Sequence, residues 1–401
     1  MPPPPPRVAV LGAGPIGLEA ALAAGERGWP TVVYESAAAV AGNVRRWAHV
    51  GLFTPWDMNV SPRMRAGLGT TAPHGLGLPT GGELIQRVYE PLAALAPVAN
   101  ALRLGWRVRA VGREGLLKHE RIGDPDRARR PFRLLVRDPG GDEHVHHADV
   151  VLDCTGTYGH PNALGDAGIP APGEEALSAH IIRHLPDLVG EARAWAGRTV
   201  LLSGAGHSAQ TAAVALAQLA AHAPGTRVIW AVRASHPDWY GVSDDPLPAR
   251  AQLTRSSREL AAGASAAVQV RLGRVTDSLA PAGGRIEVTL RNGQPERLEV
   301  DRILALNGGV GDHSIYRQLQ VHECYATAGP MKLAATLLGE SGGDCLAQAG
   351  HGPDVLTNPE PDFFMLGAKS YGRNSQFLLR IGWEQVDDVF GLLDAQRAVP
   401  R

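Results

Sequence analysis

RVAVLGAGPIGLEAALAAGERGWPTVVYE, residues 7–35, is the stretch that decides the fold. The apolar run Val8–Leu11 leads into three glycines and an Ala- and Leu-rich segment of helical pattern, and a second apolar run ends on Glu35. This order predicts a strand, a glycine turn, a helix and a second strand. We therefore predict an α/β dinucleotide-binding unit built on parallel strands.

Each residue type in the glycine turn has a physical role. Gly12 permits the tight turn, Gly14 lets the backbone approach a pyrophosphate, and Gly17 lets the helix pack closely on the strand. The helix that begins near Pro15 offers free N–H groups and a positive dipole end to phosphate. Glu35 follows by about 20 residues, the spacing at which a carboxylate accepts hydrogen bonds from ribose hydroxyls. A bare structural turn is the alternative interpretation.

Length, charge and cysteine usage limit the function classes. The 401 residues suffice for two domains, and the net charge of -1 disfavours a nucleic-acid surface. No apolar run approaches the length of a membrane span, so we predict a cytoplasmic protein without membrane contact. Cys154, Cys324 and Cys345 form no CxxC, which favours a reducing compartment and excludes an internal disulfide relay of that type.

The glycine pattern occurs a second time. Residues 198–219, RTVLLSGAGHSAQTAAVALAQL, again predict a strand, a glycine turn and a helix, with Gly204, Gly206 and Ala209 at the three key positions. Each unit is followed by a hairpin pattern and a buried strand. Two such units indicate two bound dinucleotides, because a single cofactor needs only one.

The second unit differs from the first in the residue that closes it. Its second strand ends on Arg233, where the first unit has Glu35. An arginine pairs with the 2′-phosphate of NADP, which a carboxylate would repel, so we predict NADPH here. His207 and Ser208, at the start of the helix, add hydrogen-bond donors for the phosphates. A solvated strand end is the alternative interpretation of Arg233.

Three further places carry a comparison with known sequences. Glu35 is followed by Ala41, Gly42 and Trp47, and Asn59 lies within MNVSPRM. The run DCTGTYGHPN surrounds Thr155 and Gly156. In these features the chain resembles the flavoproteins with two dinucleotide-binding domains. It is most similar to the flavin-containing monooxygenases, with thioredoxin-reductase-like enzymes as a neighbouring branch.

The resemblance covers nearly the whole chain and implies its architecture. It implies two Rossmann-like three-layer domains, with an NADPH domain (166–305) inserted into a discontinuous FAD domain (1–165 and 306–401). By the same resemblance, Gly42 and Trp47 wrap the FAD ribose and pyrophosphate, and Asn59 faces the C4a side of the flavin. Thr155 and Gly156 then cross from the FAD domain to the second domain.

The C-terminal segment resembles the family less closely. Gly367, Ala368 and Lys369 stand where the reductases have Gly-Asp against the flavin ribityl chain. By the resemblance, Lys369 adds charge at flavin N1 or contacts the NADP phosphate, and a solvent-facing loop lysine is the alternative. The spacing of Leu379, Trp383, Val386 and Phe390 predicts an amphipathic helix from Gln376. By the resemblance, this helix directs its positive end at the flavin C2 carbonyl.

The resemblance implies an FAD- and NADPH-dependent monooxygenase. Its reduced flavin would capture O2 as a C4a-hydroperoxyflavin and oxidise a soft nitrogen or sulfur nucleophile of a small molecule. Asn59 is the candidate donor to the peroxide, and a turn residue is the alternative. Two rival functions stay open, a reductase that serves a quinone, a small disulfide or a protein carrier, and a non-catalytic redox sensor. A homodimer is compatible with either.

Two local patterns give further expectations. Residues 81–95 predict a helix that Pro91 kinks or ends. His144, His146 and His147 lie along a predicted hairpin strand, where adjacent side chains face opposite sides, so we do not expect a metal site there.

Overall fold

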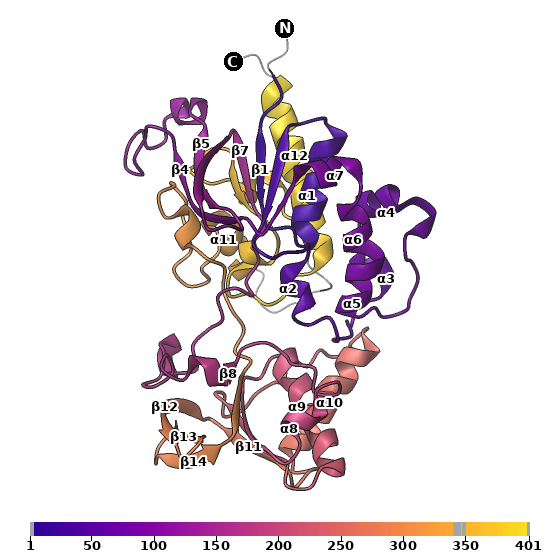
Figure 1. The fold of residues 1–401 in the computed structure, drawn as a ribbon, viewed down its shortest axis with the longest axis vertical. Coiled ribbons are helices and arrows are strands. Elements are labelled where there is room, and N and C mark those ends of the chain that lie inside the picture. Colours follow the sequence, from indigo (N-terminus) through magenta and orange to yellow (C-terminus); the bar gives the residue numbers. More distant parts are fainter. Residues whose placement is uncertain (1–3, 340–345, 347–349, 399–401) are drawn as a thin grey trace. The chain divides into compact units, whose positions relative to one another are not determined.

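The computed structural model describes residues 4–339, 346 and 350–398, and the chain divides into two compact units. The first unit comprises Met1–Ala48, Thr54–His160 and Val310–Arg401. The second comprises His49–Phe53 and Pro161–Gly309. Figure 1 shows both units, coloured along the sequence.

The first unit is built on a five-stranded parallel sheet in the order β16-β7-β1-β2-β3. Parallel pairing places Leu11 opposite both Tyr34 and Asp153, so the strands end along one edge. In open α/β sheets, ligands bind outside this carboxyl edge. The strands are β1 (Val8–Leu11), β2 (Thr31–Glu35), β3 (Leu102–Leu104), β7 (Val150–Asp153) and β16 (Phe363–Met365).

Helices and a second sheet cover the two faces of this sheet. Val10 faces helix α1, because a Cβ on Gly17 would lie 3.5 Å from the Val10 side chain. Its neighbours Ala9 and Leu11 point the other way, into a cluster with the antiparallel sheet. Figure 1 shows α1 beside α12, and the two helices pack on each other. These layers comprise α1 (Pro15–Glu26), α12 (Leu379–Ala398), β4 (Arg107–Arg113), β5 (Phe132–Arg137) and β6 (Glu143–Ala148).

Short helices fill the connections of the first unit. The helical stretch from Gly81 continues past Pro91 to Ala93, so of the two predicted effects of Pro91, a kink or an end, the end is wrong. A π-helical turn at Ile85–Tyr89 precedes Pro91, and such a turn accommodates a residue that lacks an N–H. The helices are α2 (Gly42–Arg45), α3 (Trp56–Asn59), α4 (Pro62–Leu68), α5 (Gly81–Leu84), α6 (Glu90–Ala93), α7 (Ala96–Ala101) and α11 (Met331–Gly339).

The second unit repeats the plan of the first. Its five-stranded parallel sheet has the order β11-β10-β9-β15-β8, and a three-stranded antiparallel sheet has the order β12-β13-β14. The turn at Asn292 and Gly293 joins β13 to β14, which confirms the predicted hairpin. The elements are β8 (Ile181–Ile182), β9 (Thr199–Ser203), β10 (Arg227–Val232), β11 (Val268–Leu272), β12 (Val275–Ala282), β13 (Arg285–Arg291), β14 (Glu296–Val300), β15 (Arg302–Ala305), α8 (Ala192–Trp195), α9 (His207–His222) and α10 (Pro248–Ala261).

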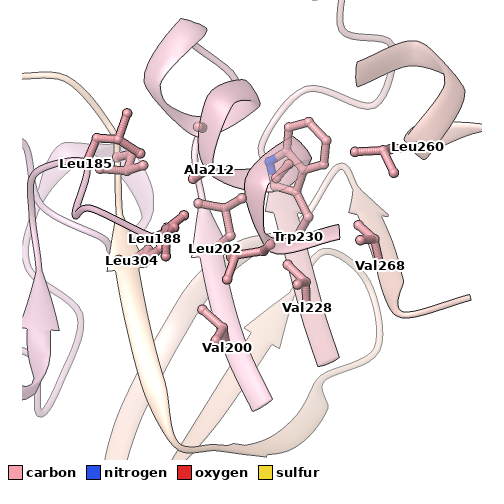
Figure 2. Close-up of a cluster of buried hydrophobic side chains, with 14 of the residues drawn as sticks. Leu185, Leu188, Val200, Leu202, Ala212, Val228, Trp230, Leu260, Val268 and Leu304 are labelled. Atoms are coloured by element: carbon pink, nitrogen blue, oxygen red, sulfur yellow. The ribbon is translucent and has the colours of Figure 1, made fainter. Parts of the chain in front are cut away.

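Alternation along the strands builds two cores in the second unit. Val200 and Leu202 of β9 pack with Trp230 of β10 and Ala212 of α9, as Figure 2 shows. Leu201, between them, packs instead against the antiparallel sheet. The parallel sheet is therefore sandwiched between helices and a second sheet. Two Rossmann-like three-layer folds in one chain confirm the predicted fold class.

Candidate dinucleotide sites

The three glycines of the first turn differ in what surrounds them. Gly12 has a φ of +96°, and a Cβ there would lie 2.8 Å from the Cys154 carbonyl oxygen. A Cβ on Gly17 would overlap the Gly12 carbonyl. A Cβ on Gly14, however, would meet no protein atom within 4 Å. The protein itself thus requires Gly12 and Gly17, while the backbone at Gly14 is accessible to a ligand.

The helix that follows is suited to an anion. Gly14 is the N-cap of α1, no side chain caps it, and its first turn contains no acidic residue. Pro15 occupies the first turn, where a missing N–H costs no hydrogen bond. The N–H groups at the start of α1 therefore remain available to a phosphate at the carboxyl edge of the sheet.

Glu35 lies beside this turn at the end of β2. Its carboxylate is buried and accepts hydrogen bonds from the backbone N–H groups of Ala13, at 2.9 Å, and Ala37, at 2.8 Å. A Cβ on Gly42 would lie 3.3 Å from Glu35 Oε1, so Gly42 allows the chain to pass close to the carboxylate. Each oxygen retains a lone pair for a further donor, as a ribose hydroxyl requires.

Trp47 packs in the same unit with one polar atom unmatched. A Cβ on Gly81 would lie 2.7 Å from the Trp47 ring, and the Tyr158 ring stacks on it at a centroid distance of 6.3 Å. The indole Nε1 is buried and has no hydrogen-bond partner among the described residues. An acceptor from a bound ligand would satisfy it, since buried indole N–H groups usually have a partner.

Two glycine segments complete the carboxyl edge. Thr155 and Gly156 follow β7, and Gly156 has a φ of +69°. Gly367 follows β16 with a φ of +73° and donates its N–H to Gln385 Oε1 of α12 at 2.8 Å. Positive φ values of this kind favour glycine, so the segments that follow β7 and β16 at this edge depend on a glycine at these positions.

The structure places Lys369 inside the protein. Its side chain is buried, and its ammonium donates to Asp153 Oδ2 at 2.5 Å and to the Asp312 carbonyl at 2.7 Å. The solvent-facing alternative for Lys369 is therefore wrong. In the sequence, the one hint of this pair was an acidic residue, Asp153, at the end of a buried strand. Lys369 lies 216 positions from Asp153, and no spacing rule relates residues so far apart.

Asn59 uses its amide within its own loop. Its Nδ2 donates to the backbone carbonyls of Thr54 and Pro55, both at 2.8 Å, and its side chain is buried. Both amide hydrogens are thus directed at protein oxygens. This geometry favours the turn alternative, in which Asn59 positions the loop at the start of α3.

The C-terminal helix begins later than the sequence predicts. The Gln376 N–H donates to Asn374 Oδ1 at 2.9 Å, and α12 starts at Leu379. The buried face of α12 contains Ile381 and Gln385 in addition to Val386 and Phe390, whereas Leu379 and Trp383 are half-buried. The predicted apolar face is therefore rotated from the observed one.

The glycine turn of the second unit repeats the geometry of the first. A Cβ on Gly204 would overlap the Leu306 carbonyl, and Ala209 packs against Gly204. A Cβ on Gly206, the N-cap of α9, would meet no protein atom within 4 Å. This turn is also supported by the Trp230 indole, whose Nε1 donates to the Gly204 carbonyl at 2.8 Å and which was not among the predicted site residues. A polar role was not visible in a tryptophan within an apolar strand.

The residues near this turn include several donors. Ser208 is exposed in the first turn of α9. The His207 ring contacts the rings of Phe53 and Tyr240, and burial lowers the pKa of His207. Arg233, directly after β10, is exposed and forms no hydrogen bond or ion pair with any described residue. A guanidinium at this edge is free to pair with a phosphate.

Neither of the two described cysteines forms a disulfide, and hydrogen bonds with Thr327 lower the pKa of the Cys324 thiol. Cys154 is buried, and burial raises the pKa of its thiol, which disfavours a reactive thiolate. Cys345 lies outside the described residues. No cluster of metal-ligating side chains occurs in the described part of the chain, and His146 instead bonds the Tyr34 hydroxyl.

The comparisons with known proteins concern the fold. No family model and no curated protein matches the sequence. Among solved structures, the bacillithiol disulfide reductase Bdr of Bacillus cereus matches with a TM-score of 0.71 and 16% identity, over 98% of this chain and 100% of that one.

None of the helices in the described ranges is long and apolar enough to cross a membrane.

Two oxygenating enzymes match as well. The cadaverine monooxygenase DfoA of Erwinia amylovora, solved with FAD, has a TM-score of 0.67 and 12% identity, over 98% of this chain and 95% of that one. The ornithine N-hydroxylase KtzI of Kutzneria sp. 744, solved with reduced FAD, NADP+ and L-ornithine, has a TM-score of 0.61 and 13% identity, over 98% and 100%. At these identities the matches establish a shared fold.

Proposed function

We propose that the chain is an oxidoreductase that binds FAD on the first unit and NADPH on the second. The observation that carries the proposal is the repeated glycine turn. In each unit the middle glycine, Gly14 or Gly206, is the one whose Cβ would meet no protein atom, and each lies at the carboxyl edge of a parallel sheet. Two open turns of this kind suit two pyrophosphates.

The residues of each unit have distinct tasks in this proposal. Around FAD, the N-terminus of α1 holds the pyrophosphate, Glu35 accepts from the ribose, and the Trp47 indole donates to the ligand. Around NADPH, the start of α9 with Ser208 holds the pyrophosphate, and Arg233 pairs with the 2′-phosphate. Bound FAD would supply the two-electron chemistry, while the protein supplies binding and orientation.

For the final electron acceptor we propose O2, with oxygenation of a soft nitrogen or sulfur nucleophile. The absence of a CxxC in the sequence and the buried Cys154 thiol argue against an internal disulfide relay. The match to a cadaverine monooxygenase and to an ornithine N-hydroxylase also supports O2 as the acceptor. Asn59 serves here as a positioning residue of its loop.

A second candidate is reduction of a small disulfide. It is favoured by the bacillithiol disulfide reductase of Bacillus cereus, whose TM-score of 0.71 exceeds those of both oxygenating enzymes described above. In this case the reduced flavin would pass its electrons to a diffusible acceptor and would react slowly with O2.

Stopped-flow mixing of the NADPH-reduced protein with oxygenated buffer separates the two candidates. For the monooxygenase we expect a transient flavin spectrum that differs from both the oxidised and the reduced spectrum. Slow reoxidation without a transient, together with rapid reoxidation by a small disulfide, would instead support the reductase. Binding of both dinucleotides without turnover towards either acceptor would leave a redox sensor.

We expect Arg233→Ser to lower the second-order rate constant for flavin reduction by NADPH by roughly 10- to 100-fold. The reason is that charge-assisted hydrogen bonds contribute about 1.5–3 kcal/mol. The rate with NADH should stay unchanged. The measurement is anaerobic single-turnover reduction at a series of NADPH and NADH concentrations. Arg227→Ser is the matched control, since Arg227 is an exposed arginine at the opposite end of β10. Equal losses with both nucleotides would contradict the assignment.

A further inference from the structure

The buried Lys369 and Asp153 pair connects three chain segments of the first unit. The two side chains are 0% exposed, and the Lys369 ammonium lies 2.5 Å from Asp153 Oδ2. The ammonium also donates to the Asp312 carbonyl at 2.7 Å and to the Thr155 hydroxyl at 3.2 Å. Its stem passes Gly311, where a Cβ would overlap it. The pair thus joins the ends of β7 and β16 to the segment around residue 312.

This pair lies at the edge of the sheet where the glycine turn begins. Asp153 is the last residue of β7, and its register partners are Leu11 in β1 and Met365 in β16. The next residue, Cys154, places its carbonyl against Gly12. A ligand held at the first glycine turn therefore lies at the same strand ends as the buried charges.

Asp153 also fixes the residues that follow it. Its Oδ1 accepts hydrogen bonds from the Thr155 hydroxyl at 2.7 Å and from the Thr155 N–H at 3.2 Å. The Tyr316 ring packs against the ammonium, with 5.0 Å from Lys369 Nζ to the ring centroid. The neighbouring Asp312 carboxylate is bound to Ser314. It also lies 3.2 Å from His160 Nε2, and the Lys369 charge helps to lower the pKa of Asp312. Lys369 and Asp153 form the pair at this point in which both side chains are fully buried.

We propose that the Asp153 and Lys369 pair sets the charge felt by the flavin and positions Thr155, so that it controls the reduction potential and the affinity of bound FAD. The inference rests on the proposed function and assigns two positioning residues to that site. Neither side chain needs to touch the flavin. Charges buried in a low dielectric are weakly screened, so their imbalance acts over longer distances than it would in water.

The sign of the charge gives a test that a purely structural role fails. Two-electron reduction adds negative charge to the flavin. Asp153→Asn leaves Lys369 unpaired and should raise the midpoint potential, whereas Lys369→Met leaves Asp153 unpaired and should lower it. The double variant should return the potential towards the wild-type value. The two single variants should lower thermal stability, because each leaves a buried charge unpaired.

The measurement is a spectroelectrochemical titration of the FAD-loaded full chain at pH 8. Asp149→Asn is the matched control, since Asp149 pairs with Arg7 just before β7 and β1, at the opposite end of the same strands. Its potential should equal that of the wild type. Shifts of the same sign in both single variants, or no shift in either, would overturn the inference.

Thr155→Val tests the same pair if a single-charge variant does not fold. It keeps both charges and removes the hydroxyl between them, so FAD affinity should fall while the potential stays constant. A shift in potential as large as those of folded charge variants, or an unchanged FAD affinity, would count against the inference. A wild-type chain that binds no FAD would instead remove the proposed function itself.

Discussion

Gly14→Val is expected to weaken FAD binding strongly while leaving the fold intact. A side chain at Gly14 meets no protein atom within 4 Å, and the backbone there is extended, with a φ of -78°, which valine adopts readily. The free energy of unfolding of the flavin-free protein should therefore change by less than about 0.5 kcal/mol. The added methyl groups would occupy the space where a pyrophosphate approaches the backbone, so the affinity for FAD should fall by roughly 100-fold or more, about 2.7 kcal/mol.

The measurements are urea unfolding of the flavin-free protein and quenching of FAD fluorescence on titration. Gly17→Ala is the contrasting variant, because its Cβ would overlap the Gly12 carbonyl and should destabilise the fold itself. Gly206→Val extends the comparison to the second unit, where it should remove NADPH binding and spare FAD. A Gly14→Val protein that binds FAD normally would place the ligand elsewhere.

Glu360→Gln is expected to cost about 3–5 kcal/mol of stability, the loss typical of leaving buried charges unpaired. Glu360 is buried with two arginines: its Oε1 accepts from Arg113 Nε at 2.9 Å, and Arg127 Nε lies 3.0 Å from each carboxylate oxygen. The Gln320 N–H donates to the same carboxylate at 2.9 Å. Burial lowers the pKa of Arg113 and the Glu360 carboxylate opposes that effect, so its removal leaves the cost of burial uncompensated.

Urea unfolding followed by circular dichroism measures this loss. Glu143→Gln is the control, since Glu143 pairs with Arg137 on the surface, where both side chains are more than 40% exposed. Such a pair contributes about 0–1 kcal/mol. Glu360 directly precedes the segment that leads into β16, so FAD affinity should fall together with stability. Equal stabilities of the two variants would show that the buried network contributes little.

Local sequence patterns were sufficient to predict the two strand, glycine-turn and helix units, whereas the arrangement of the domains was implied by the family resemblance. A glycine turn, its helix and the flanking strands are encoded within about 30 residues, and the spacing of Gly12, Gly14 and Gly17 reflects contacts inside that segment. The same holds for the second turn. The layer that each side chain of β9 faces also follows from the sequence, because successive side chains of a strand point to opposite faces of the sheet.

The details of the candidate sites depended on contacts between distant segments. Lys369 meets Asp153 across 216 positions, and Arg113 meets Glu360 across 247. The buried face of α12 is set by its contact with α1, where a Cβ on Gly382 would overlap Ile16. A hydrophobic period alone cannot specify that rotation. Glycine and charged residues in loops carry no local signal for their partners, so only the three-dimensional arrangement showed that Lys369 is buried.

If the two glycine turns bind two different dinucleotides, an anaerobic titration of the purified, FAD-loaded chain with NADPH will show it. We predict about one FAD per chain, and complete bleaching of the flavin absorbance by one equivalent of NADPH. NADH should be a much poorer reductant. A chain that retains no FAD after loading, or a bound flavin that NADPH does not reduce, would contradict the assignment of FAD and NADPH to the two turns.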